Sequence, residues 1–434
     1  MPHSVADTIQ LIRIREQQGQ TNTAQQTCGT GLADEPWIAD AAGPGYGPGA
    51  SAWDTISANA PVQGVLPVEY RRSSPAEIDL RIRAAKAALG DRLTILGHFY
   101  QRDEIVQYAD FLGDSFQLAQ AAQSRPQAQA IVFCGVHFMA ETADMLSRPD
   151  QAVILPNLAA GCSMADMADI DTVTDCWDEL HALFANETAQ DDRAPILPVT
   201  YMNSSTALKA FCGTHGGVVC TSSNAATVLA WAFQRGRRVL FFPDQHLGRN
   251  TAKAMGIPLD EMSVWHPDRP LGGSDAQALQ RSRVILWHGF CSVHKRFTVG
   301  QIHMARQRHH GITVVVHPEC TMEVVDAADE SGSTDYIRRR VQAAPAGSSF
   351  AIGTEINLVQ RLAHEHPDKT IVCLDSIVCP CSTMYRIHPS YLAWVLEGLE
   401  RGVVLNQIKV PADIAAPARI ALERMLALRP GAAA

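Results

Sequence analysis

Short apolar runs, each followed by a turn rich in Gly or polar residues and then by an amphipathic stretch, recur through most of the chain. This alternation is typical of parallel β-strands joined by α-helices, because the crossover helices cover the faces of such a sheet. The predicted strands form three successive sets, which begin at Leu93, Ile196 and Val284. The pattern therefore predicts an α/β protein with three similar domains, each built on a short parallel sheet.

The same pattern gives expected limits for these domains. Residues 1–75 contain a long stretch rich in Gly, Ala and Pro, which has little apolar surface to bury, so we expect a largely irregular extension. We predict that the three α/β domains occupy 76–190, 191–281 and 282–410. A C-terminal helix and tail are expected over 411–434.

Two segments carry clear local signals. Ser73 or Ser74 can cap a helix that begins near Pro75, and Gly90 can end it. Residues 257–281 are polar and rich in Pro and Gly, which predicts an excursion over the surface.

Cysteines follow three of the apolar runs, at Cys162, at Cys291 and at the pair Cys379 and Cys381. Ligands of parallel sheets bind outside the carboxyl ends of the strands, so we expect these thiols to converge. Three isolated thiolates fit a metal site with one open position, either zinc with water or a [4Fe–4S] cluster with one free iron. Buried structural thiols are the alternative, and the spacing alone leaves these interpretations open.

Composition narrows the class of protein. The chain has 434 residues, of which 46% are hydrophobic and 19% are charged, as in ordinary globular proteins. A net charge of −9 without a basic stripe argues against nucleic acid as a partner. Eleven cysteines, an odd number, favour a reducing compartment. Neither a membrane span nor a secretory signal is evident, so we expect a cytoplasmic protein.

Polar side chains gather at the same predicted strand ends. For each of them alone, helix capping or packing is the ordinary explanation. Together, at helix N-termini, they would form a site for carboxylate or phosphate groups. His317 and Glu319, two positions apart in an extended segment, form a candidate acid–base pair. The polar set consists of His98, Tyr100, Ser115, Tyr201, Asn203, Ser222, His317, Glu319 and Thr334.

Short motifs at these strand ends resemble, in the same order, those of the quinolinate synthases, the iron–sulfur enzymes of de novo NAD biosynthesis. The resemblance covers residues 93–405 and implies three similar three-layer αβα domains around a pseudo-threefold axis, with the active site at the centre. The matching motifs lie at 97–101, 113–115, 138–143, 161–165, 201–204, 221–225, 243–247, 289–294, 317–320, 332–334 and 353–355.

The resemblance implies a [4Fe–4S] cluster held by Cys162, Cys291 and a third cysteine. Cys381 is the better match for the third ligand, because Met384 follows it at the spacing usual in the family, whereas Cys379 lacks this spacing. Other thiols, such as Cys134 and Cys320, do not match cluster positions and are expected to be structural.

By the same resemblance, the enzyme condenses iminosuccinate with dihydroxyacetone phosphate to give quinolinate, phosphate and water, with the free iron as Lewis acid. Glu319 is the preferred general acid or base, and Tyr100 is expected to assist isomerisation. The other expected catalytic residues are His317 and Tyr201. The residues expected to bind substrate are His98, Ser115, Tyr201, Asn203, Ser222, His294, His317, Glu319 and Thr334.

Three other functions stay open. A cluster-dependent hydro-lyase acting on another small dicarboxylate would use the same open iron. An iron–sulfur sensor would need a DNA-binding element, which the sequence does not show. A zinc protein would use the same thiols. An unstable imine substrate would also make functional coupling to L-aspartate oxidase useful.

Overall fold

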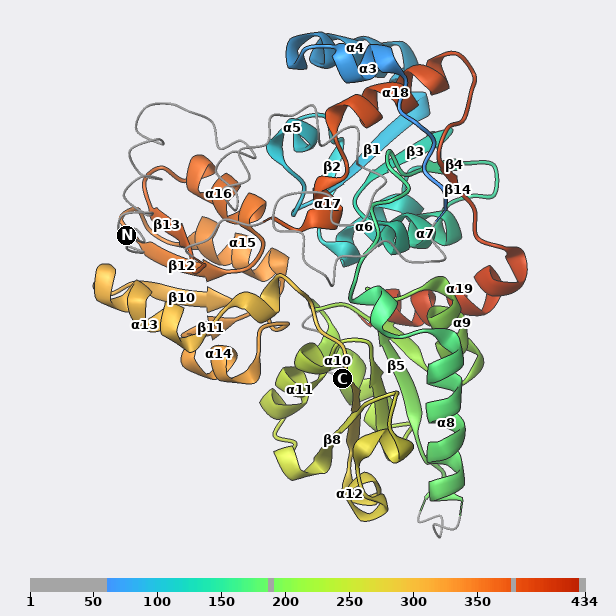
Figure 1. The fold of residues 1–434 in the computed structure, drawn as a ribbon, viewed down its shortest axis with the longest axis vertical. Coiled ribbons are helices and arrows are strands. Elements are labelled where there is room, and N and C mark those ends of the chain that lie inside the picture. Colours follow the sequence, from blue (N-terminus) through green and yellow to red (C-terminus); the bar gives the residue numbers. More distant parts are fainter. Residues whose placement is uncertain (1–60, 186–190, 376–379, 429–434) are drawn as a thin grey trace.

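A computed structural model describes residues 61–185, 191–375 and 380–428 of the chain (Figure 1). Within this part, the strands form three separate sheets, and each sheet with its covering helices forms one αβα unit. We name these the first, second and third units in chain order. Figure 1 shows them as three lobes, with the first unit at the top, the second at the bottom and the third on the left.

Each unit has four parallel strands in the same spatial order, and two units carry an extra edge strand. The first sheet contains β1 (Leu93–His98), β2 (Phe111–Gly113), β3 (Ala130–Cys134), β4 (Ala152–Ile154) and the antiparallel β14 (Gln407–Ile408). The second contains β5 (Leu197–Tyr201), β6 (Val218–Cys220), β7 (Val239–Phe242), β8 (Met262–Trp265) and β9 (Val284–Trp287). The third contains β10 (Thr313–Val316), β11 (Glu330–Ser331), β12 (Ser349–Gly353) and β13 (Thr370–Cys373).

The shared order runs second, first, third, fourth strand when the edge strand β8, which precedes β9 in the chain, is left out of the count. The three orders are β2-β1-β3-β4, β6-β5-β7-β9 and β11-β10-β12-β13. Most of the central strands are buried along their whole length, as expected for parallel sheets with helices on both faces. The repeated topology confirms the prediction of three similar α/β domains.

The helices cover these sheets and connect their strands. In the first unit they are α3 (Val68–Arg72), α4 (Pro75–Leu89), α5 (Asp103–Val106), α6 (Ser115–Gln123), α7 (His137–Leu146) and α18 (Pro389–Glu400). In the second they are α8 (Ile170–Phe184), α9 (Thr206–Thr214), α10 (Ala225–Phe233), α11 (Gln245–Ala254), α12 (Ala276–Arg281) and α19 (Ala412–Ala427). In the third they are α13 (Val299–Arg308), α14 (Met322–Ala327), α15 (Thr334–Ala343), α16 (Ile356–Glu365) and the connecting α17 (Ser382–Tyr385). None of these described helices is long and apolar enough to cross a membrane.

The helix predicted near Pro75 is present, and its ends follow the sequence signals. Ser74 caps α4 in a capping box with Glu77, and Pro75 occupies the first turn. Gly90 ends the helix with a φ of 51°, a conformation that favours glycine.

Two expectations about the second unit were wrong. Strand β9 pairs with β7 and β8 in the second sheet, whereas the sequence pattern had placed Val284 in the third set. The segment 257–281 contains β8 and α12, so it is not only a surface excursion. Most residues of the edge strand β8 are only half-buried, which explains why this strand lacks an apolar run. We therefore propose that the second domain extends through β9.

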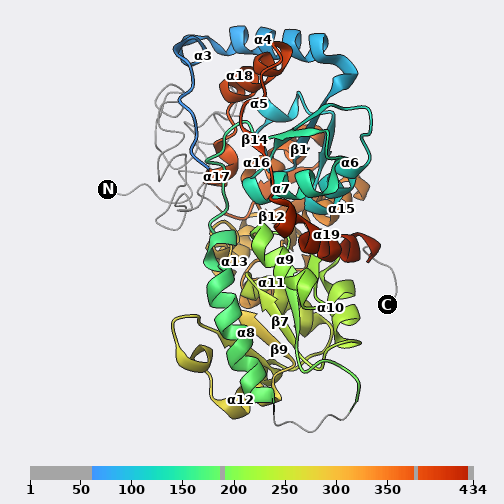
Figure 2. The same ribbon diagram turned by 90° about the vertical axis from the view of Figure 1, so that its right-hand side faces the viewer.

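The C-terminal part of the chain ties the first and second units together. Helix α18 packs on α4, and α19 packs on α9 at the junction of these units (Figures 1 and 2). At Gly213 of α9, an added Cβ would lie 1.8 Å from the carbonyl oxygen of Pro417 in α19, so the two helices approach too closely for any other residue. One continuous apolar core runs through the first and second units, while separate clusters cover the two faces of the third sheet.

Candidate active site

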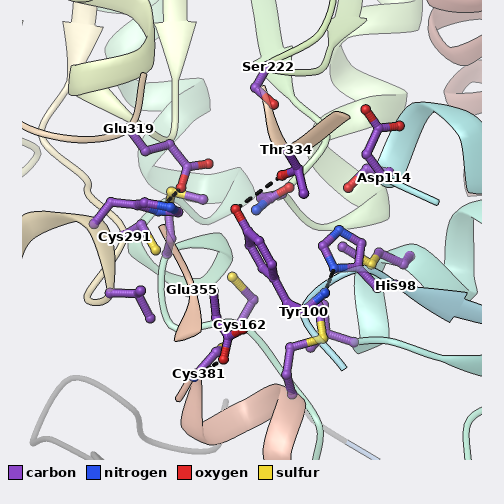
Figure 3. Close-up of a pocket in the computed structure, with 18 of the residues that line it drawn as sticks. His98, Tyr100, Asp114, Cys162, Ser222, Cys291, Glu319, Thr334, Glu355 and Cys381 are labelled. Atoms are coloured by element: carbon purple, nitrogen blue, oxygen red, sulfur yellow. Dashed lines mark hydrogen bonds and ion pairs between the residues drawn. The ribbon is translucent and has the colours of Figure 1, made fainter. Parts of the chain in front are cut away.

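A cavity of about 670 Å³, which includes space open to solvent, lies where the strand ends of the three units face one another (Figure 3). Every site residue predicted from the sequence lines this cavity, although the residues come from all three units. They are His98, Tyr100, Ser115, Cys162, Tyr201, Asn203, Ser222, Cys291, His294, His317, Glu319, Thr334 and Cys381.

The units contribute polar groups from equivalent positions. The first strand of each sheet ends at or just before a lining residue, namely His98, Tyr201 and His317. Helices α6 and α15 begin with the lining residues Ser115 and Thr334, while Ser222 precedes α10. One helix N-terminus from each unit therefore faces the cavity region. Backbone N–H groups at such termini attract anions.

The described residues that line the cavity include neither Lys nor Arg. An anionic ligand would therefore be held by hydroxyl, amide and imidazole groups together with helix N-termini. Asn203 adds an acceptor to the cavity, because its buried Oδ1 has no hydrogen-bond partner among the described residues and can accept from a donor group of a ligand.

His98 ends β1, and its Nδ1 accepts a hydrogen bond from the backbone N–H of Tyr100 at 3.1 Å. Burial, and then the charge of Arg361, lowers the pKa of His98 to about 3, so the ring is neutral at physiological pH. A neutral imidazole that accepts at Nδ1 carries its proton on Nε2. His98 is therefore a hydrogen-bond donor at Nε2.

A chain of hydroxyl groups links Tyr100 to the third unit. The Tyr100 hydroxyl lies 2.7 Å from Thr354 Oγ1 and accepts a hydrogen bond from Thr334 Oγ1 at 3.1 Å. Thr354 Oγ1 also lies 3.1 Å from Nε2 of His294. Burial is the main cause that raises the pKa of Tyr100 well above its ordinary value, so the phenol keeps its proton at neutral pH.

Glu319 is the centre of the charged part of the site. Its Oε2 lies 2.6 Å from Nδ1 of His294, and its backbone N–H donates to Nδ1 of His317 at 3.3 Å. Burial acts to raise the pKa of Glu319, but the adjoining imidazoles outweigh burial and hold the pKa below its ordinary range. Burial, and then His294, lowers the pKa of His317 to about 3, so His317 is neutral and the effect on Glu319 comes chiefly from His294.

The three thiols reach the cavity from separate segments of the chain. Cys162 follows β4, Cys291 follows β9, and Cys381 precedes α17 (Figure 3). Burial raises the pKa of both Cys162 and Cys291, and nearby thiols of the set add to this effect. Buried thiolates without a compensating cation are unfavourable, whereas a bound metal ion stabilises them. The donor set therefore fits a metal group with thiolate ligands.

Cys291 also belongs to a second group of ligand atoms. Its Sγ, one ring nitrogen of His294 and one carboxylate oxygen of Glu319 lie within 4.8 Å of one another, and these residues could hold a metal ion. We call Cys162, Cys291 and Cys381 the thiol region of the cavity, and His294, His317 and Glu319 its charged region. The two regions meet at Cys291.

Two acidic side chains of the site were not predicted as functional, although both lie in the sequence motifs. Glu355 is fully buried and accepts hydrogen bonds from the backbone N–H of Cys381 at 3.1 Å and from that of Asn357 at 2.8 Å. Burial raises the pKa of Glu355 to about 7. Asp114 caps α6 and accepts a hydrogen bond from Ser223 Oγ of the second unit at 2.6 Å.

The remaining cysteine predictions have different outcomes. Cys134 and Cys320 are buried and do not line the cavity. Cys379 lies outside the described residues.

Comparison with known proteins points to one family. A sequence model of the family described as quinolinate synthetase A protein (NadA) matches residues 80–427. A quinolinate synthase of Corynebacterium glutamicum is 66% identical over 387 residues, which are 89% of this chain and 96% of the relative. Quinolinate synthases of Geobacillus kaustophilus and Streptomyces coelicolor are each 55% identical, over 84% and 82% of this chain and 96% and 90% of their own lengths.

Proposed function

Because the chain belongs to the quinolinate synthetase A family, we propose that it condenses iminosuccinate with dihydroxyacetone phosphate to form quinolinate, with release of phosphate and water. The reaction is a step of NAD biosynthesis. One observation carries the proposal to these residues: all the side chains that resemble the family's site line a single cavity between the three units.

The cofactor we propose is a [4Fe–4S] cluster held by Cys162, Cys291 and Cys381. Three thiolates on four irons leave one iron open, and that iron would supply a Lewis acid that polarises a substrate oxygen. The half-buried thiols support this assignment, because a cationic group would offset the cost of their ionisation. Glu355 would fix the third ligand by accepting the backbone N–H of Cys381.

The anionic groups of the substrates would be bound by Ser115, Ser222 and Thr334 at the starts of their helices. His98 would add the N–H donor on Nε2. Asn203 and the other polar residues would orient the carbon skeleton, and the Oδ1 of Asn203 is an acceptor for an N–H or hydroxyl group of the substrate.

Proton transfer would centre on Glu319. Because its pKa is held low, Glu319 is a carboxylate at neutral pH and acts first as a base, with His294 beside it to stabilise the charge. Tyr100 and Tyr201 keep their protons and would act as hydrogen-bond donors or acids toward substrate oxygens. His317, which is neutral, would orient the substrate beside Glu319.

The test begins with anaerobically purified protein. We expect about four iron and four sulfide per chain, as a [4Fe–4S] cluster requires, together with an iron–sulfur absorption spectrum. We also expect formation of quinolinate when both substrates are supplied. Turnover of another dicarboxylate without formation of quinolinate would support the hydro-lyase.

Zinc without iron would support a zinc protein, an alternative favoured by the group formed by Cys291, His294 and Glu319. Iminosuccinate is unstable in water, so direct supply from L-aspartate oxidase stays a prediction of the proposed function.

A further inference from the structure

Glu319 belongs to the third unit, and its nearest functional partner lies at the boundary between the second and third units. Glu319 follows β10 of the third sheet, whereas His294 lies in the connection between β9 of the second sheet and α13 of the third unit. Their contact at 2.6 Å therefore depends on how the turn that carries Glu319 is held at this boundary. The turn 317–320 carries Glu319 across this boundary.

Asn250 of α11 holds that turn from the second unit. Its side-chain Nδ2 donates one hydrogen bond to the carbonyl of Pro318 and another to the carbonyl of Cys320, each at 2.8 Å. These two carbonyls flank Glu319 in the sequence. An amide NH₂ has two hydrogens, so one side chain can fix both carbonyls. Asn250 is 7% exposed and does not line the cavity.

We propose that Asn250 is a positioning residue that sets the place of Glu319 against His294. The inference rests on the role proposed above for Glu319. The hydrogen bond of Asn250 to Cys320 is buried and that to Pro318 is partly buried, so loss of the amide would take this donor from both carbonyls and let the turn move. A displacement of about 1 Å at a reacting group costs on the order of 100-fold in rate.

Lys253, one turn further along the same helix, provides a matched control. Its ammonium pairs with Asp326 of α14 at 2.6 Å, so it also crosses from the second unit to the third. This pair is partly exposed and does not contact the turn that carries Glu319. Exposed pairs of this kind contribute little to stability.

The experiment compares Asn250→Ala, Asn250→Asp and Lys253→Met as cluster-loaded proteins. We expect Asn250→Ala to lower kcat about 10- to 100-fold, with KM and iron content close to those of the parent protein. Asn250→Asp should be at least as impaired, because a carboxylate oxygen would face two carbonyl oxygens. Lys253→Met should keep the kcat of the parent protein.

A crystal structure of Asn250→Ala gives a readout that does not depend on activity. The Glu319–His294 contact should be lost or lengthened in it. An unchanged contact, an unchanged kcat, or a loss of kcat that only parallels loss of iron or unfolding would each overturn the inference. Absence of quinolinate formation by the parent protein would instead overturn the proposed function, while the crystallographic result would still stand.

Discussion

Burial acts in the same direction on the thiol region and the charged region of the cavity, but only the charged region offsets its effect on the pKa. Burial raises the pKa of Cys162 and Cys291, and no described neighbour offsets this fully. Glu319 is more deeply buried than these half-buried thiols, yet its pKa is held low because His294 lies beside it. The charged region therefore carries its own compensation, whereas the thiol region needs a cation from outside the chain. This difference indicates which part of the site depends on a cofactor.

The largest expected effect is removal of a thiol from the cavity. Cys162→Ser, Cys291→Ser or Cys381→Ser should each abolish activity and deplete iron, because each removes one of three cluster ligands. Anaerobic iron and sulfide counts beside an activity assay would measure this. Cys134→Ser removes a buried thiol outside the cavity and serves as the matched control.

Cys379→Ser should have a milder effect than Cys381→Ser. If Cys379→Ser abolished activity while Cys381→Ser did not, our choice of the third ligand would be wrong.

Replacement of Glu319 should impair the charged region and leave the thiol region intact. Glu319→Gln keeps the shape of the side chain but removes the base, so turnover should fall about 100- to 10,000-fold. The iron content should stay at the parent level, because Glu319 is not among the three thiolate ligands. Steady-state kinetics and iron analysis on the same preparation would show this, and normal turnover would exclude Glu319 from proton transfer.

The effect of His294 on the pKa of Glu319 can be tested through the pH dependence of kcat/KM. His294→Gln removes the imidazole that lowers the pKa of Glu319, so the carboxylate should take up a proton at higher pH than in the parent protein. Since the base is active only when ionised, the acid limb of kcat/KM should move upward. A profile that stays in place would mean that His294 does not control the charge of Glu319.

The smallest effect should come from the hydroxyl that joins Tyr100 to His294. Thr354→Val removes the shared partner of both side chains while it preserves volume. The loss of a hydrogen bond of this kind should reduce kcat about 2- to 10-fold, with the cluster spectrum unchanged. A larger loss of kcat together with a changed cluster spectrum would show that the thiol region and the charged region do not act independently.

The sequence predicted the repeated unit and the lining residues because both have local signatures. Apolar runs mark buried parallel strands, and polar residues directly after them lie at the edge where ligands bind. Membership in a sheet has no such signature, so Val284 was assigned to the wrong set. Strand β8 was missed because an edge strand needs few apolar residues.

Glu355 and Asn250, which support the site, could not be predicted from the sequence for a related reason. Glu355 was present in a motif, but its partner is the backbone of Cys381, and a backbone N–H leaves no trace in the sequence. Asn250 is similar, because both its acceptors are carbonyl groups of a distant turn. The role of such residues can be recognised only in the folded structure, where their hydrogen-bond partners lie next to them.

The lack of Lys and Arg among the described lining residues bears on how a catalytic cycle finishes. A guanidinium or ammonium would hold inorganic phosphate by charge after its bond to carbon is broken. Hydroxyl groups and helix N-termini instead bind an anion through short, directional hydrogen bonds. In the proposed reaction, release of phosphate would therefore break hydrogen bonds to hydroxyl groups and helix N-termini, and no ion pair with a Lys or Arg of the described lining residues.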